Sequence, residues 1–299
     1  MTCANVCSRH VTRSTSDGRT WSEPIPAGEG NETWGNELAS GIALRFGDGH
    51  SLLAAYRTDC ADPREGLPGG GFPANCTSNP DGSHGAWDPK TNVVHPTVNR
   101  VLISSDSGAT WRAGGPTPPA TDGSQAFGWT ECQGAELSNG SVVLTSRALQ
   151  PVGGQGVALL PVQRRFAISH TGGETWARSW GFPGDQTGGA GPGYNTAASL
   201  ISAQQGERLL LSKPTAGCKG GKWPCNHNEY RRNMTVASSS DGGSSWSVED
   251  WGLAYLGLAA YSDMTVLPDG RIGLAFERGT TQEYRFVSFV ALTPPWLGQ

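Results

Sequence analysis

An eight-residue turn pattern, Ser-x-Asp-x-Gly-x-Thr-Trp, repeats along this chain and constrains its fold more than any other feature. Two copies, at residues 104–111 and 239–246, keep the pattern closely, and degenerate copies occupy residues 14–21 and 169–176. In such a turn Asp or Ser bonds the backbone, Gly takes a positive φ and Trp packs under the hairpin. An alternating strand precedes each copy, as at residues 98–103. The repeat therefore predicts one β unit used several times.

The spacing of the copies predicts the architecture. They begin 90, 65 and 70 residues apart. A four-stranded blade occupies about 40–50 residues, so one or two blades separate neighbouring copies. The 43 glycines and 11 tryptophans among 299 residues also favour many short strands joined by turns. We expect an all-β protein, a six-bladed β-propeller, in which residues 1–299 form a single domain.

Composition argues against several classes of function. The net charge of −4 gives no support to nucleic-acid binding, which usually needs a basic face. No run of about 18 apolar residues is present, so no transmembrane segment is expected.

Cys60 with Cys76, and Cys218 with Cys225, bracket loops and could form disulfides in an oxidising compartment, or remain free thiols in the cytosol. No second Cys pair or His pair falls at zinc-ligand spacing, so we expect neither metal nor cofactor.

Sequons give a weak indication of location. Potential N-glycosylation sites begin at Asn31, Asn75, Asn139 and Asn233. Such triplets also arise by chance in a chain rich in Ser and Thr. Together with the cysteine loops they predict a lysosomal or extracellular protein on the secretory route, although the first residues form no apolar signal segment.

Three other blocks carry the residues of a reaction. Residues 130–147 begin Thr-Glu-Cys-Gln and end in Arg147; residues 229–236 read Glu-Tyr-Arg-Arg-Asn-Met-Thr-Val; residues 259–264 read Ala-Ala-Tyr-Ser-Asp-Met. In this order, and with the turn repeats as Asp-boxes, they resemble the sialidase (neuraminidase) family, most closely the lysosomal sialidases of animals. The resemblance implies an exo-α-sialidase, a glycoside hydrolase that removes terminal sialic acids from glycoproteins, glycolipids such as gangliosides, and oligosaccharides. Sialylated glycans are the implied partners.

The resemblance also implies the role of each residue. Tyr261 is the nucleophile and Glu131 takes its proton. A tyrosine suits this reaction because the anomeric carbon of sialic acid carries a carboxylate, which would repel a carboxylate nucleophile. A phenol with a pKa near 10 needs such a base beside it. Arg147 and Arg231 bind the substrate carboxylate, a task that suits the planar and permanently charged guanidinium.

Some of these assignments have rivals nearby in the sequence. Glu136 competes with Glu131, but the family block Glu-Cys-Gln favours Glu131 and leaves Glu136 to cap the hairpin. Arg232 competes with Arg231; strand alternation sends the two to opposite faces, and the family block Arg-x-Asn-Leu-Thr favours Arg231. Glu277, sixteen residues after the tyrosine, is expected either to brace an arginine or to lie on the surface.

The start of the chain departs from the family pattern. The family carries its first carboxylate-binding arginine and its aspartate general acid ahead of the first Asp-box, but no Asp or Glu precedes Asp17 here. The residues before that box supply at most one or two strands. We therefore expect an incomplete first blade in an N-terminally truncated chain, which could itself be inactive. Asp59 is the best placed substitute acid, and residues 39–44 resemble the family's Gly-Ser-Gly-Ile block at the entrance of the site.

Two other classes of function remain open. A non-catalytic Asp-box propeller that binds glycans or a protein partner predicts no convergent set of Tyr, Glu and Arg. A glycosidase acting on neutral glucans predicts an acidic pair in a long cleft and no arginine cluster. The discriminating observation is whether Glu131 and both arginines converge on Tyr261, with the phenol within hydrogen-bond reach of Glu131.

Overall fold

The computed structural model describes residues 10–16, 18–26, 38–43, 52–58, 87–88, 93–94, 98–118, 128–149, 164–182, 196–215, 231–247 and 252–293. Apart from one 3₁₀ turn, Gln204–Gly206, every regular element among them is a β-strand. All strand pairs are antiparallel. The all-β prediction is confirmed. Nowhere in these ranges is there a helix long and apolar enough to cross a membrane.

The strands form three large sheets and two small ones. The first large sheet has the order β3 (Leu38–Ala43), β4 (Leu52–Thr58), β7 (Val98–Ser104), β8 (Arg112–Ala113). The second has the order β12 (Arg178–Gly181), β11 (Arg165–Ser169), β10 (Val142–Leu149), β9 (Gly128–Glu136). The small sheets pair β1 (His10–Val11) with β2 (Ile25–Pro26) and β5 (Trp87–Asp88) with β6 (Val93–Val94).

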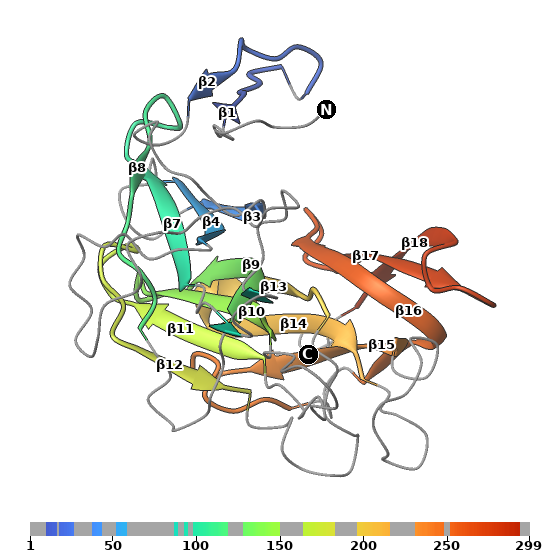
Figure 1. Cartoon of the computed structure of the whole chain (residues 1–299). Helices are drawn as coiled ribbons and strands as arrows, with labels where there is room; N and C mark the ends of the chain where they lie inside the picture. Colours follow the sequence, from blue (N-terminus) through green and yellow to red (C-terminus); the bar gives the residue numbers. More distant parts are fainter. Residues whose placement is uncertain are drawn as a thin grey trace.

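The third large sheet contains six strands in chain order. They are β13 (Ser199–Ala203), β14 (Arg208–Pro214), β15 (Arg232–Ser239), β16 (Leu253–Val266), β17 (Ile272–Gly279) and β18 (Phe286–Leu292). The long β16 joins two halves of this sheet, because its first part pairs with β15 and its later part pairs with β17. Figure 1 shows β16, β17 and β18 turned away from β13, β14 and β15.

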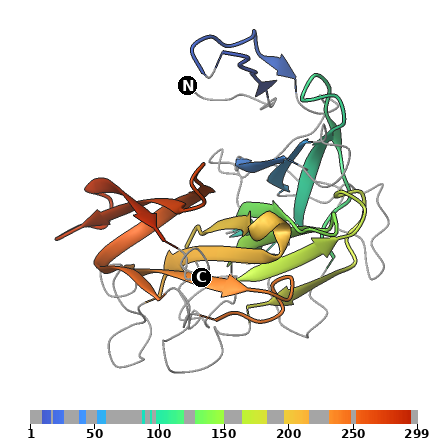
Figure 2. The ribbon, with the colours of Figure 1, turned by 180° about the vertical axis from the view of Figure 1, so that it is seen from behind.

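Successive sheets pack against each other through their first strands. β3 contacts β9 and β9 contacts β13, and within the third sheet β13 also contacts β16. Figures 1 and 2 show the first, second and third sheets following one another around the molecule, with the β1–β2 hairpin standing apart. This sequential packing of antiparallel sheets is the arrangement expected of propeller blades.

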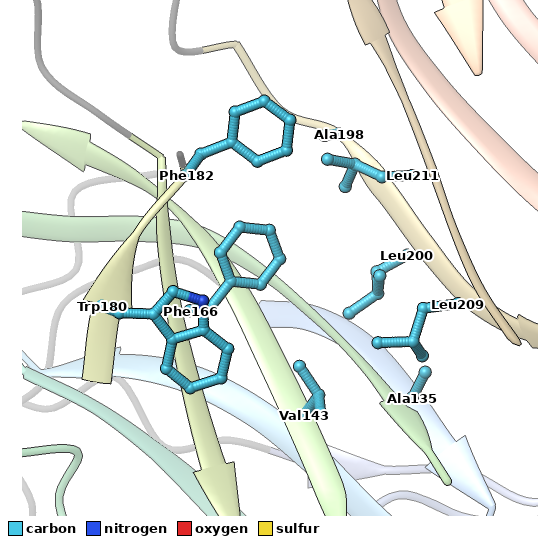
Figure 3. Packing of buried hydrophobic residues seen from close by; sticks show 9 residues of the cluster. All are labelled: Ala135, Val143, Phe166, Trp180, Phe182, Ala198, Leu200, Leu209 and Leu211. Atoms are coloured by element: carbon cyan, nitrogen blue, oxygen red, sulfur yellow. The ribbon is translucent and has the colours of Figure 1, made fainter. Parts of the chain in front are cut away.

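Apolar clusters fill the space between neighbouring sheets. The cluster in Figure 3 joins the second sheet to β13 and β14, and its members are Ala135, Val143, Phe166, Trp180, Phe182, Ala198, Leu200, Leu209 and Leu211. Another cluster joins β7 to the second sheet, and a third lies within β13–β17. Alternation along each strand produces these clusters, since every second side chain faces the same neighbour.

The strict turn repeats adopt the predicted geometry. Asp106 Oδ1 accepts the Thr110 backbone N–H at 2.8 Å, and Asp106 Oδ2 accepts the Thr110 hydroxyl at 2.6 Å. Ser104 Oγ accepts another N–H of the turn at 2.7 Å. Asp241 makes the equivalent bonds in the copy at residues 239–246. The carboxylate therefore closes a turn whose backbone donors would otherwise lack partners.

The degenerate copies form the same turn with a hydroxyl in place of the carboxylate. Thr171 Oγ1 accepts the Thr175 N–H at 2.9 Å, and Ser16 Oγ accepts the Thr20 N–H at 2.8 Å. Each hydroxyl also lies within hydrogen-bond distance of the hydroxyl four residues later. The turn prediction is confirmed for these copies as well, although neither has an aspartate at the bonding position.

The tryptophans of the turns differ in burial. Trp176 is buried, and Trp246 packs against the rings of Phe166 and Phe182. Trp21 packs on its own turn, since its Nε1 donates to the Gly18 carbonyl at 3.1 Å as Trp246 does to Gly243, but it is 63% exposed. The reason is that it belongs to the two-stranded β1–β2 unit, and the apolar clusters of the described residues include no residue of that unit.

Candidate active site

Glu131, Arg147 and Tyr261 converge although they come from β9, β10 and β16. The phenol of Tyr261 donates a hydrogen bond to Glu131 Oε1 at 2.8 Å across 130 residues of sequence. Arg147 Nη1 lies 3.1 Å from both carboxylate oxygens of Glu131, so the two form an ion pair. The hydrogen-bond distance expected between the phenol and this carboxylate is present.

Arg231, the residue just before β15, completes the cluster. Its side chain is 3% exposed, and its guanidinium carbon lies 5.3 Å from the centroids of both the Tyr261 and Tyr284 rings. Its Nη1 also donates to the Tyr284 hydroxyl. Arg232, the rival in sequence, is exposed. The cluster therefore contains Arg231 and not its neighbour, as alternation predicts.

Tyr284 was not singled out by the sequence. It lies between β17 and β18, its ring packs edge-on against the Tyr261 ring at 6.4 Å, and it is 51% exposed. It stands outside every block that carries the family resemblance. The one available signal was its type, since a half-exposed aromatic residue with a polar tip often meets a ligand.

Three irregularities of strand pairing surround the cluster. The β9–β10 pairing shifts where Glu131 lies, the β15–β16 pairing shifts at Asn233, and the β16–β17 pairing shifts at Tyr261. Glu131 and Asn233 have φ values of 47° and 61°, in the left-handed region. Bulges redirect side chains and are common beside active sites. A positive φ at a glutamate costs about 1–3 kcal/mol, which the surrounding pairing must offset.

The cluster keeps its phenol protonated. Burial is the largest cause that raises the pKa of Tyr261, followed by its hydrogen bond to Glu131 and the negative charge of that carboxylate. The positive charges of Arg147 and Arg231 act in the opposite direction. Burial also raises the pKa of Tyr284, against the charge of Arg231. The resting arrangement is thus a neutral phenol beside a base that can accept its proton.

The remaining candidates have mixed outcomes. Glu136 is buried at the end of β9, next to the β9–β10 turn. Glu277 does not lie on the surface unpartnered: its Oε2 accepts the Tyr261 backbone N–H at 3.2 Å. Asn139 is exposed, whereas Asn233 Oδ1 accepts the Gly257 N–H, so this sequon asparagine is used within the fold.

Several predictions concern residues outside the described ranges. These are Asp59, the pairs Cys60 with Cys76 and Cys218 with Cys225, and the sequons at Asn31 and Asn75. Of residues 39–44, the backbone belongs largely to β3. In the described part of the chain, His, Cys, Asp and Glu side chains form no group of three or more that could hold a metal ion. The described cluster is one of phenol, carboxylate and guanidinium groups.

Comparison with known proteins places the chain in a family. Residues 2–274 match the BNR repeat-like domain family, and the chain belongs to it. It is 28% identical to a sialidase of Micromonospora viridifaciens over 200 residues, which cover 66% of this chain and 25% of that protein. The relative is bacterial and not a lysosomal sialidase of animals. The family prediction is therefore confirmed at the level of BNR repeat proteins, and the animal lysosomal branch was wrong.

Solved structures agree on the fold. A variant of the NanB sialidase of Streptococcus pneumoniae matches 95% of this chain and 35% of its own, with a TM-score of 0.58 and 21% identity. An intramolecular trans-sialidase of Ruminococcus gnavus matches 95% of this chain and 50% of its own, with a TM-score of 0.57 and 20% identity. The chain thus has the fold of sialidase propellers and spans a quarter to a half of the length of these proteins.

Proposed function

We propose that this chain is the catalytic propeller of an exo-α-sialidase and hydrolyses terminal α-linked sialic acids of glycoproteins, glycolipids and oligosaccharides. The observation that carries the proposal is the 2.8 Å hydrogen bond from Tyr261 to Glu131, made inside a cluster with two arginines. A glycosidase that acts on neutral sugars has no need of such cations. The relatives whose names include sialidase support the same reading.

The cluster supports a retaining mechanism with a tyrosine nucleophile. As the phenol oxygen of Tyr261 attacks the anomeric carbon, its proton passes to Glu131, and the bond to the leaving sugar breaks as a general acid protonates the leaving oxygen. Water then attacks the anomeric carbon and gives a proton to the carboxylate that protonated the leaving sugar. The bond to Tyr261 breaks, and Glu131 returns its proton to the phenol oxygen. A neutral phenol approaches the substrate carboxylate without the repulsion that an ionised nucleophile would meet.

Arg147 and Arg231 are proposed to bind the substrate carboxylate. Both side chains face the phenol, and a guanidinium forms strong bonds to a carboxylate in a partly buried site. In the structure Arg147 is paired with Glu131 and Arg231 with Tyr284. Substrate binding then adds a carboxylate to the Glu131 carboxylate beside Arg147 and to the Tyr284 hydroxyl beside Arg231. For the acid that protonates the leaving group, Asp59 stays the proposed residue.

The test is hydrolysis of a fluorogenic α-sialoside by the whole chain, compared with Tyr261→Phe and Glu131→Gln. We expect both variants to lose turnover. The parent chain should release sialic acid with retained anomeric configuration, which nuclear magnetic resonance can follow. Binding of sialyllactose without turnover would instead support the alternative, a non-catalytic glycan-binding propeller. Turnover of a matched fluorogenic β-glucoside would contradict the assignment of substrate.

We also propose that residues 1–299 belong to one six-bladed propeller and that the protein follows an export route. The sequential contacts of first strands support the first proposal. The spacing of the cysteines supports the second, and alkylation of free thiols under non-reducing conditions tests it. Four protected thiols, at positions 60, 76, 218 and 225, are expected, whereas seven alkylated cysteines would contradict it.

A further inference from the structure

The strand pairing beneath Tyr261 is irregular. Between Ala259 and Ser262 the register of β16 against β17 shifts, so that two residues of β16, one of them Tyr261, oppose Glu277 alone. This two-against-one arrangement is a β-bulge. A bulge interrupts the ladder and leaves a backbone group in need of another partner.

The carboxylate of Glu277 provides that partner. Its Oε2 accepts the N–H of Tyr261 at 3.2 Å from directly across the strand pair. At the bulge between β15 and β16 a side chain also accepts a backbone N–H: Asn233 Oδ1 accepts the N–H of Gly257 at 3.4 Å. Side-chain oxygens thus take the place of carbonyls at two neighbouring irregularities.

The bulge determines where the phenol points. Tyr261 belongs to the third sheet, whereas its partner Glu131 belongs to the second, and no ladder connects β16 to β9. The direction of the side chain therefore depends on the local backbone at position 261. In a strand, shifting the pairing by one residue sends a side chain to the other face.

We propose that Glu277 is the positioning residue of Tyr261: its carboxylate holds the bulged amide and thereby directs the phenol toward Glu131. The catalytic consequence rests on the proposed function, but the positioning itself does not. Glu277 acts on the backbone of the tyrosine and has a different task from the arginine brace considered for it. The proposal accounts for why an acidic residue lies opposite the bulge.

The pKa of the Tyr261 phenol depends on the groups around it. The ionisable groups that face it are Glu131 on β9, Arg147 on β10, Arg231 before β15 and Tyr284 after β17. Burial and the hydrogen bond to Glu131 raise the pKa of Tyr261. A phenol that turns away from Glu131 toward solvent therefore titrates closer to an ordinary tyrosine.

Three substitutions distinguish the effect of the hydrogen bond that Glu277 accepts from the effect of its negative charge. Glu277→Ala removes the acceptor of the Tyr261 amide, whereas Glu277→Gln keeps an oxygen at the same place and removes the charge. Asp269→Ala is the matched control, because this exposed carboxylate binds Arg271 in the turn of the same hairpin. Urea unfolding of each variant shows whether the fold is retained.

The first readout does not require activity. Tyrosinate absorbance is followed against pH in the whole chain, and the same titration with Tyr261→Phe added isolates this phenol. In Glu277→Ala the phenol should titrate at a lower pH than in the parent, and in Glu277→Gln and Asp269→Ala close to the parent. No shift in Glu277→Ala, or equal shifts in the Ala and Gln variants, would overturn the proposal.

The second readout is turnover of a fluorogenic α-sialoside. Glu277→Ala should lower kcat roughly 10²-fold with little change in KM, because the nucleophile is misdirected while the carboxylate site persists. Glu277→Gln should recover most of that loss, and Asp269→Ala should match the parent. A chain without turnover that shows the expected titrations contradicts the proposed function and supports the positioning. Unchanged kcat in Glu277→Ala of an active chain overturns the positioning alone.

Discussion

The turn at residues 104–111 and the cluster around Tyr261 use similar chemical groups over very different distances in the chain. In the turn, Asp106 bonds a hydroxyl and an N–H that lie four residues away. In the cluster, the phenol bonds a carboxylate 130 residues away, and Arg231 bonds a hydroxyl 53 residues away. A local segment suffices for the first geometry, whereas the second exists only when several sheets are assembled in register.

The difference separates stability from activity. A turn residue stabilises its own hairpin, and its loss should lower stability without moving the reacting groups. A cluster residue can be replaced with little effect on the hairpins but with a large effect on the reaction. Substitutions in the two regions should therefore change different measurements, and any variant that changes both would break the comparison.

The largest expected effect is the loss of reaction when the phenol or its base is removed. Tyr261→Phe and Glu131→Gln should each lower kcat for a fluorogenic α-sialoside by roughly 10²–10⁴-fold. Urea midpoints should stay near that of the parent. The control is Asp241→Asn in the fourth turn, which should leave kcat unchanged. Normal turnover of Tyr261→Phe would remove the nucleophile from the proposed mechanism.

The next effect concerns substrate binding and uses neighbouring arginines. Arg231→Lys should raise KM about 10- to 100-fold, because one compact ammonium replaces a planar fork that makes charge-assisted bonds. The matched variant Arg232→Lys changes an exposed residue that points away from the cluster. Its KM should equal that of the parent. An equal rise of KM in Arg231→Lys and Arg232→Lys would show that the two arginines contribute positive charge without a defined binding geometry.

The turns and the cluster also differ in how well the sequence predicts them. The turns were predictable because eight residues contain both the donors and the acceptors. Even their degenerate copies follow, since Ser16 and Thr171 supply the oxygen that Asp supplies elsewhere. Burial of the turn tryptophan was less predictable, because Trp21 depends on a neighbouring core that its own segment does not encode.

The site was predictable only in part. Motif blocks identified Glu131, Arg147, Arg231 and Tyr261, and alternation distinguished Arg231 from its neighbour. The bulges were not predictable, because a register shift depends on how two strands pair and leaves no mark in either strand. Tyr284 was missed for a related reason, since its contact with Arg231 joins the connection after β17 to the residue before β15, two strands that are separated by β16 in the sheet.

A stability difference of about 1 kcal/mol is expected at the bulge that carries Glu131. With a φ of 47° at this position, Glu131→Gly should be more stable than Glu131→Ala by about 1 kcal/mol, because an L side chain is disfavoured there. At Gln133, two residues further along β9, the order should reverse, since Gly weakens an ordinary strand. Urea unfolding measures both pairs. The same order at both positions would show that the glutamate backbone is not strained.

A smaller effect is expected when the carboxylate of a turn is exchanged for a hydroxyl. Asp241→Thr should keep most of the turn, because Thr171 already performs this task at residues 169–176. Asp241→Ala leaves the donors without the oxygen and should melt about 2–4 °C below Asp241→Thr. Thermal unfolding followed by circular dichroism gives the comparison. Identical melting temperatures would mean that the turn does not depend on this side chain.

The smallest effect is the pH dependence of one turn, and its sign follows from linkage. Hydrogen bonds from Thr110 and Ser104 lower the pKa of Asp106 to about 2 in the folded chain. The unfolded value is about 3.9, so the folded state favours the ionised form. The contribution to stability is therefore present above pH about 4 and is lost as the pH falls toward about 2. Asp106→Asn should show a smaller decline of stability across this window than the parent. Thr171→Ala removes a hydroxyl that does not titrate, so the free energy of unfolding that this variant loses relative to the parent should stay constant from pH 4 to pH 2. If the stability of both variants instead changes with pH in parallel, the acid effect comes from groups outside the turns.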